Sequence, residues 1–241
     1  MRAWLVVHSV HASVSATLDA MLGWIADAAT AGAEMVMFSE AALTGLMATG
    51  DPARDRDLAE AVPGTTTKML SAAAGRWRIY VGFGLYERAG SALFDSAVVL
   101  GPDGSIALHY RRIDSRWHDR HVDRAAYRER TEVPVATTAF GRVAVVICGD
   151  LFNDHVCALL AELNLDVVVL PMARGFDEDA PDEVAWATSE VEAYAERAAH
   201  LGLAVLLVKT PGAGSPRRPF RRWGDGVLPE RRADRAPANP N

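Results

Sequence analysis

The chain has 241 residues, of which 50% are hydrophobic and 23% charged, and its formal net charge is −6. This acidic balance argues against a nucleic-acid partner, which would require a basic face, and no apolar run approaches the roughly 20 residues of a membrane helix. Two cysteines cannot build a disulfide framework, and the first residues show no secretory leader pattern. We therefore expect one cytoplasmic α/β domain with no membrane partner.

Strand-like and helix-like segments alternate from the N-terminus at the spacing of βαβ units. Apolar patterns predict strands over 3–7, 34–38, 79–86, 92–100 and 105–110, and helices over 17–31 and 66–76. The segment 47–61 is typical of a loop with a short helix. The turn signal at 101–104 predicts a hairpin between the strands on either side of it, so the sheet should be mixed.

The segment 111–130 carries alternating charges without an apolar period, which predicts a solvated loop. It contains His118 and His121, but no spacing typical of metal ligands is present. We expect neither a metal nor another cofactor.

The most informative stretch is 142–150, RVAVVICGD, in which an apolar strand runs directly into Cys148. The residues 151–163 show a helical apolar face, so Cys148 is predicted to lie at a strand-to-helix elbow. The N-terminus of the following helix would favour a thiolate there, which predicts a lowered pKa and a reactive thiol. The alternative is a small buried residue, and this is our interpretation of Cys157.

Further along the chain, apolar runs predict strands over 166–170 and 203–208, with a helix over 183–199 between them. Glu40 follows the strand predicted over 34–38. A carboxylate at that strand end could meet Cys148 if both strands belong to neighbouring parts of the fold.

Four motifs occur in a fixed order: E-x-x-L-T-G at 40–45, G-x-x-E at 84–87, Y-R-R-I at 110–113 and I-C-G-D at 147–150. Together they resemble the nitrilase superfamily of carbon–nitrogen hydrolases. The resemblance implies a four-layer αββα sandwich with mixed sheets, which assembles as a homodimer or a higher homo-oligomer. It also implies that Cys148 is the nucleophile and Glu40 the base.

Three positions depart from the pattern of that family. Arg112 stands where the family has a lysine, and arginine does not readily give up a proton. Gly149 replaces the aromatic residue that usually follows the cysteine, and Asp123 stands in place of an accessory glutamate. The resemblance makes Arg112 the third catalytic candidate, and it makes Gly149 and Asp123 candidate contacts of a small amide substrate.

Three functions remain open on the sequence alone. The first is hydrolysis of an amide, a carbamoyl amide or a nitrile through a cysteine thioester. The second is a weakened or inactive relative that binds a small amide or a protein partner. The third is an unrelated α/β protein with a reactive elbow cysteine, in which His155 would be the partner of Cys148.

The resemblance covers residues 1–212, which we interpret as the hydrolase domain. The tail, 213–241, is rich in arginine and proline and has no apolar period, which is typical of disorder. Its residues 220–235, back-translated with GC-rich codons and read one base later, can give a glycine-rich strand, turn and strand. We therefore hypothesise a frameshift near 212–216, which resequencing of the DNA would test.

Overall fold

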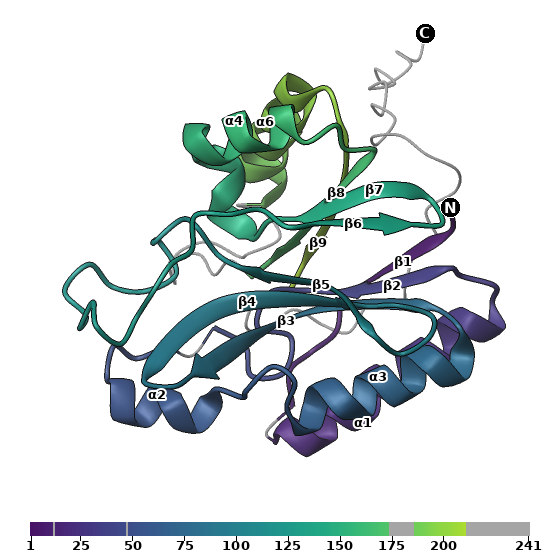
Figure 1. Ribbon diagram of the computed structural model, residues 1–241, viewed down its shortest axis with the longest axis horizontal. Coiled ribbons are helices and arrows are strands. Elements are labelled where there is room, and N and C mark those ends of the chain that lie inside the picture. Colours follow the sequence, from purple (N-terminus) through teal and green to yellow (C-terminus); the bar gives the residue numbers. More distant parts are fainter. Residues whose placement is uncertain (12, 47, 174–185, 211–241) are drawn as a thin grey trace, which may run out of the picture.

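The computed structural model describes residues 1–11, 13–46, 48–173 and 186–210, and these residues form two β-sheets with helices on their outer faces (Figure 1). The first sheet has the strand order β1-β2-β3-β4-β5. Its strands are β1 (Ala3–Val6), β2 (Met35–Phe38), β3 (Tyr80–Ala89), β4 (Ala92–Leu100) and β5 (Ile106–Arg111). The first three strands are parallel, and β3, β4 and β5 pair antiparallel, so the sheet is mixed as predicted.

The second sheet has the order β6-β7-β8-β9. Its strands are β6 (Val135–Thr138), β7 (Gly141–Val145), β8 (Val167–Met172) and β9 (Ala204–Lys209). A hairpin joins β6 to β7, whereas β7, β8 and β9 are parallel and are connected by helices. The carboxyl ends of β7 and β8 therefore lie at the same edge of this sheet.

The helices complete four layers in the order α-β-β-α (Figure 1). Helices α1 (Val14–Thr30) and α3 (Thr65–Trp77) cover the first sheet, and α4 (Asp154–Glu162) and α6 (Val191–Leu201) cover the second. Side chains alternate between the two faces of each strand, so one face of the first sheet packs on its helices and the other on the second sheet. The short helix α2 (Pro52–Leu58) lies in the loop predicted over 47–61.

Most predicted elements are confirmed, but four details differ. The segment 111–130, predicted as a solvated loop, is partly buried, because Trp117 and Tyr127 pack in a hydrophobic cluster. The strand β6 was missed, because its sequence VATT has only two apolar residues. The helix predicted over 151–163 begins later, since a 3-10 turn, Cys148–Phe152, precedes α4. The helix predicted over 183–199 is observed as a π-helical turn, Trp186–Glu190, followed by α6. The tail that was interpreted as disordered or frameshifted lies outside the described residues.

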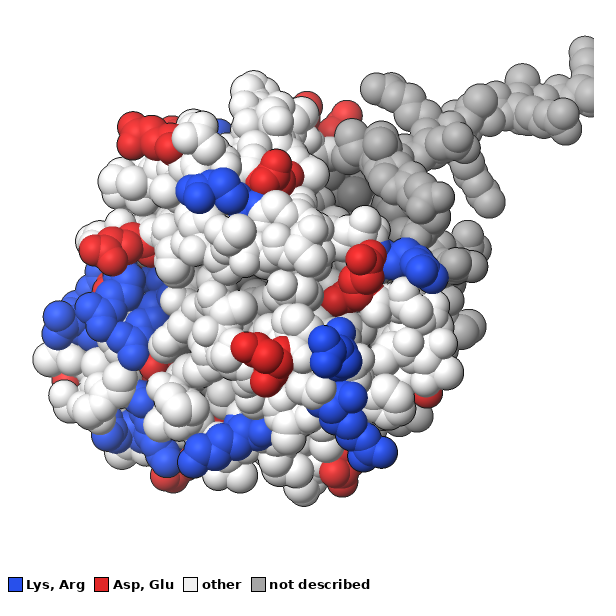
Figure 2. Space-filling model, turned by 45° about the vertical axis from the view of Figure 1, so that its right-hand side comes forward, with Lys and Arg blue, Asp and Glu red and all other residues white. Residues whose placement is uncertain are grey.

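Charged side chains of both signs are scattered over the surface. On the face shown in Figure 2, lysine and arginine side chains form small groups with acidic side chains beside them, separated by uncharged surface. None of the helices in the described part of the chain is long and apolar enough to cross a membrane.

Candidate active site

Cys148 lies where β7 ends and the chain turns into the second helical layer. Its φ angle is +46°, a left-handed conformation that is rare for residues with a side chain and that costs on the order of 1–3 kcal/mol. Only 8% of Cys148 is exposed. The predicted elbow is therefore confirmed, and the fold holds the thiol in a strained conformation inside the protein.

The carboxylate of Asp150 holds this elbow in place. Its Oδ2 accepts hydrogen bonds from the backbone N–H of Ile147 at 2.8 Å and from the Tyr110 hydroxyl at 2.7 Å, and its Oδ1 accepts from the Asp114 N–H at 2.8 Å. Burial raises the pKa of Asp150, and these bonds together with Arg112 oppose that rise. Asp150 thus links the elbow in one sheet to the end of β5 in the other.

Glu40 lies just beyond the end of β2 and is 1% exposed. Ala41, which follows it, has a φ of +45°, so the chain turns sharply beside Glu40 as it does at Cys148. Gly84 in β3 makes room for this turn, because a Cβ there would lie 2.6 Å from the Glu40 Cα. The G-x-x-E motif therefore begins with a residue that lets β3 approach the Glu40 backbone.

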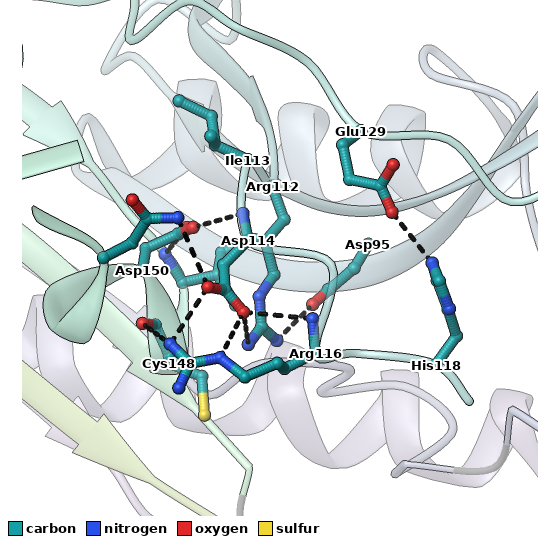
Figure 3. A network of polar contacts seen from close by, with 12 residues as sticks. Asp95, Arg112, Ile113, Asp114, Arg116, His118, Glu129, Cys148 and Asp150 are labelled. Carbon is teal, nitrogen blue, oxygen red and sulfur yellow. Dashed lines mark hydrogen bonds and ion pairs between the residues drawn. The ribbon is translucent and has the colours of Figure 1, made fainter. Parts of the chain in front are cut away.

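Arg112 follows β5 and contacts three carboxylates, of which Figure 3 shows Asp95 and Asp114. Its Nη1 donates to Glu40 Oε1 at 2.8 Å and to Asp95 Oδ2 at 3.1 Å, and its Nη2 lies 3.9 Å from Asp114 Oδ1. Burial lowers the pKa of Arg112, but Glu40 and Asp95 outweigh burial and leave that pKa above its ordinary value. The guanidinium therefore carries a positive charge between these carboxylates.

The guanidinium of Arg112 lies against the backbone of Gly149. A Cβ on Gly149 would lie 2.8 Å from Arg112 Nη2 and 3.5 Å from Arg116 Nη2. Any side chain at this position would therefore displace a guanidinium group. The glycine leaves the space that Arg112 occupies.

Arg116 forms a second positive group beside the elbow (Figure 3). Its Nε and Nη2 donate to the two oxygens of Asp114 at 2.7 Å and 2.9 Å, and Nη2 also donates to the Gly149 carbonyl at 2.9 Å. The side chain of Arg116 is 59% exposed, so this cation lies between the solvent and the buried guanidinium of Arg112.

The thiol of Cys148 is less acidic than the sequence predicted. Burial, followed by the charge of Glu40, raises its pKa to about 12, and Arg112 opposes this rise. The prediction of a lowered pKa is wrong for this state, because α4 begins six residues after Cys148 and its N-terminus does not act on the sulfur. The sulfur lies 3.8 Å from the hydroxyl of Tyr194 in α6.

Two candidate residues from the sequence do not lie beside Glu40, Arg112 and Cys148. Asp123 is exposed, and its Oδ1 accepts the N–H of Ala125 at 2.8 Å within its own turn. His155 is exposed at the start of α4 rather than facing Cys148. Spacing along the chain predicted the place of Asp123 in a family motif, but it could not predict the direction of the side chain.

Asp95 and Tyr194 are the residues that sequence reasoning missed. Asp95 carried a signal, since it is a charged residue within the apolar strand β4. Tyr194 carried none, because a tyrosine on the buried side of a helix is typical of a core residue. Among the described residues, no group of histidine, cysteine, aspartate and glutamate side chains is placed to hold a metal ion.

Comparison with known proteins shows the family of the chain. The carbon–nitrogen hydrolase family matches residues 5–208, and the chain belongs to that family. A solved carbon–nitrogen hydrolase from Helicobacter pylori has a TM-score of 0.74 at 20% identity, covering 87% of this chain and 73% of that one. An amidase of the nitrilase superfamily from Nesterenkonia AN1 has a TM-score of 0.69 at 18% identity, covering 89% and 78%. At these identities the two structures show the fold alone.

Curated relatives are similar over shorter stretches. An omega-amidase from Homo sapiens is 29% identical over 160 residues, which are 62% of this chain and 55% of the relative. A bifunctional nitrilase/nitrile hydratase from Lupinus angustifolius is 28% identical over 148 residues, 55% of this chain and 42% of the relative. The chain thus spans about half the length of the curated relatives that it matches.

Proposed function

We infer that this carbon–nitrogen hydrolase cleaves a non-peptide C–N bond of a small amide or carbamoyl amide, or of a nitrile, through a thioester on Cys148. The observation that supports this most is that Glu40, Arg112 and Cys148 are buried together: Arg112 donates to Glu40 at 2.8 Å, and the charges of both residues act on the Cys148 thiol. The reaction needs a nucleophile, a base and a positive group, and these three supply them.

The first half of the reaction forms the thioester. The Cys148 sulfur attacks the amide carbon while its proton passes to Glu40, and the C=O bond opens to an oxyanion. Arg112 and the elbow backbone around Gly149 stabilise that negative charge. The oxyanion then collapses, the C–N bond breaks, and Glu40 returns the proton to the leaving amine.

The second half restores the enzyme. Glu40 takes a proton from water as the water oxygen attacks the thioester carbon, and the collapse of the second oxyanion breaks the C–S bond. The sulfur regains a proton and the carboxylic acid leaves. No metal or cofactor enters either half. Because the free thiol has a raised pKa, thiolate forms during the attack and not beforehand.

Intact-mass spectrometry tests the thioester directly. The full chain is mixed with a panel of simple amides, carbamoyl compounds and nitriles, and is quenched in acid within the first turnovers. We expect an added acyl mass on Cys148 that is absent from Cys148→Ala and that accumulates more slowly in Glu40→Gln. An adduct on Cys157, or turnover by Cys148→Ala, would contradict the proposal. A solved structure of the Nesterenkonia amidase has acrylamide added to its active site cysteine, so acrylamide is a useful additional probe.

A second candidate is a weakened family member that binds a small amide without turnover. The specific observation in its favour is Arg112, which holds Glu40 in an ion pair at 2.8 Å and does not readily release a proton. In that case, thermal melting would show stabilisation by an amide from the panel while no product or adduct forms. Membership of the family removes the unrelated α/β alternative.

The oligomeric state and the cellular location also remain proposals. We expect a homodimer or a higher homo-oligomer in the cytoplasm, without a nucleic-acid partner. Light scattering on the purified full chain would test the assembly, and a monomer at micromolar concentration would contradict it.

A further inference from the structure

Asp95 is a second buried carboxylate that shares the guanidinium of Arg112 with Glu40. Arg112 Nη1 donates to both carboxylates, at 2.8 Å to Glu40 Oε1 and at 3.1 Å to Asp95 Oδ2. The Asp95 carbonyl also accepts the Arg112 backbone N–H at 2.8 Å, which fixes the two residues relative to each other. Asp95 and Glu40 are each 1% exposed. Water therefore does not stabilise either charge.

The charges at this point do not balance if both carboxylates are ionised. One guanidinium faces two carboxylates, which leaves one excess negative charge in a buried place. The neighbouring charged groups have partners of their own: Arg116 pairs with Asp114 at 2.7 Å, and Asp150 accepts three hydrogen bonds. Among the described groups, Arg112 and Cys148 act directly on the pair, and the groups around Arg112 are Tyr110, Asp114, Arg116 and Asp150.

The hydrogen bonds do not balance either. Both oxygens of Glu40 accept N–H donors, Oε1 from Arg112 and Oε2 from the backbone of Ala173. Asp95 Oδ1, by contrast, is buried without a donor within the described part of the chain. The two carboxyl groups lie side by side, because both accept from the same nitrogen of Arg112. A single proton between them would satisfy Oδ1 and remove the excess charge.

We propose that Asp95 is a positioning residue of the hydrolase site and that it holds one proton jointly with Glu40 at neutral pH. The pKa of Asp95 is raised by burial against the effect of Arg112, and that of Glu40 is raised by burial and by Asp95, which agrees with the geometry. The catalytic meaning of this pair rests on the proposed function. When the shared proton is on Asp95, Glu40 is ionised and can accept the thiol proton.

The shared proton also keeps the site neutral during attack. Before the attack, the pair carries one negative charge against Arg112. After Cys148 gives its proton to Glu40, both carboxyl groups are protonated, and the new negative charge on sulfur faces Arg112 instead. The net charge of the buried group is the same in both states, so no uncompensated charge develops. An arginine that keeps its proton is compatible with this exchange.

Infrared spectroscopy tests the shared proton without any substrate. At pH 7 we expect the C=O stretch of a protonated carboxylic acid in the parent, and its loss in both Asp95→Asn and Glu40→Gln, because the remaining carboxylate then pairs with Arg112 and ionises. Asp114→Asn is the matched control, since it removes a carboxylate 3.9 Å from Arg112 whose pKa is lowered, and the band should remain. A parent without the band, or variants that keep it, would overturn the proposal.

The pH dependence of activity tests the catalytic part. In Asp95→Asn we expect the acidic limb of kcat/KM to move up by about one pH unit, because ionised Glu40 loses the proton that Asp95 donates to it. A purely structural Asp95 would lower Tm and leave this limb in place, which would overturn the positioning role. If no substrate is turned over, the proposed function fails while the infrared result still decides the shared proton. If Asp95→Asn does not fold, Glu40→Gln alone decides the infrared test.

Discussion

Gly149 and Arg112 fit each other: a Cβ on Gly149 would lie 2.8 Å from Arg112 Nη2. The sequence shows both as departures from the nitrilase superfamily, one replacing an aromatic residue and the other a lysine. The structure makes them one feature, because the wide guanidinium occupies the space that a side chain after the cysteine would need.

The first prediction concerns this contact. Gly149→Ala should force the guanidinium of Arg112 away from Glu40, at a cost of about 1–3 kcal/mol in the free energy of unfolding and at least about tenfold in kcat. Urea unfolding and steady-state rates measure the two effects. Gly90→Ala is an informative control, because Gly90 has open space around it but a φ of +61°, so it reports backbone strain without a clash. Unchanged kcat in Gly149→Ala would contradict the steric account.

The second prediction concerns Arg112→Lys. The family pattern alone favours a gain in turnover, but the structure favours a loss, because the single nitrogen of lysine leaves the space beside Gly149 empty. Adding Gly149→Ala should then do less harm in Arg112→Lys than in the parent. A double-mutant cycle on stability and on kcat measures this coupling. Strictly additive effects would show that the two positions are independent.

The third prediction concerns the thiol. Because burial raises the pKa of Cys148 to about 12, its alkylation by iodoacetamide in the folded chain should keep accelerating as the pH rises to 10. In denaturant the rate should level off nearer the ordinary thiol pKa of about 8.5. Peptide mapping separates Cys148 from Cys157. A folded-state plateau below pH 9 would show that the thiol is acidic, as the sequence suggested.

Features that depend on consecutive residues could be predicted from the sequence, whereas features that depend on distant contacts could not. The strands and the elbow at Cys148 were predictable, because apolar runs and turn residues are written in consecutive positions. The strand β6 was not, since its threonines carry little apolar signal. Its hairpin with β7 supplies the pairing that the pattern lacked.

Site chemistry was predictable only in part. The motifs predicted Glu40, Arg112 and Cys148 as candidates, and in the structure all three are buried and Arg112 donates to Glu40 at 2.8 Å. The direction of the thiol pKa was wrong, because burial and the charge of Glu40 come from distant parts of the chain. Asp95 was visible in the sequence as a charged residue within an apolar strand. Its partner, Arg112, follows the neighbouring strand β5, and the spacing along the chain could not predict that contact.

The fourth prediction concerns pH and stability through Glu87. Its Oε1 pairs with Arg111 Nη2, and its Oε2 contacts His109 Nε2 at 2.8 Å and accepts from Ser96 Oγ at 2.7 Å. Burial works to raise the pKa of Glu87, but the bonds from Arg111 and His109 outweigh it and lower that pKa to about 2. The stabilisation is therefore complete above the ordinary pKa of 4.5 and is lost as the pH falls toward 2.

Glu87→Gln should thus lower the free energy of unfolding by up to about 3 kcal/mol at pH 7, and the difference from the parent should shrink as the pH falls below 4.5. Urea unfolding at several pH values measures it. Glu162→Gln, at an exposed position on α4, should show a small difference that does not vary with pH. A Glu87→Gln deficit that persists unchanged at pH 3 would contradict the assignment.

The last prediction concerns the link between β5 and the elbow. The Tyr110 hydroxyl donates to Asp150 Oδ2 at 2.7 Å and accepts the Ile113 N–H at 3.2 Å, and Tyr110 is fully buried. Tyr110→Phe should lower the free energy of unfolding by about 1.5–3 kcal/mol, because a buried charged acceptor loses a donor. It should also lower kcat more than it changes KM, since the elbow that aims Cys148 is loosened while the groups that contact substrate remain. Tyr80→Phe is the matched control: its hydroxyl meets only the Ala139 N–H among the described residues, at 3.4 Å, so kcat should be unchanged. Equal falls in the two variants would mean that Tyr110 acts through general packing and not through Asp150.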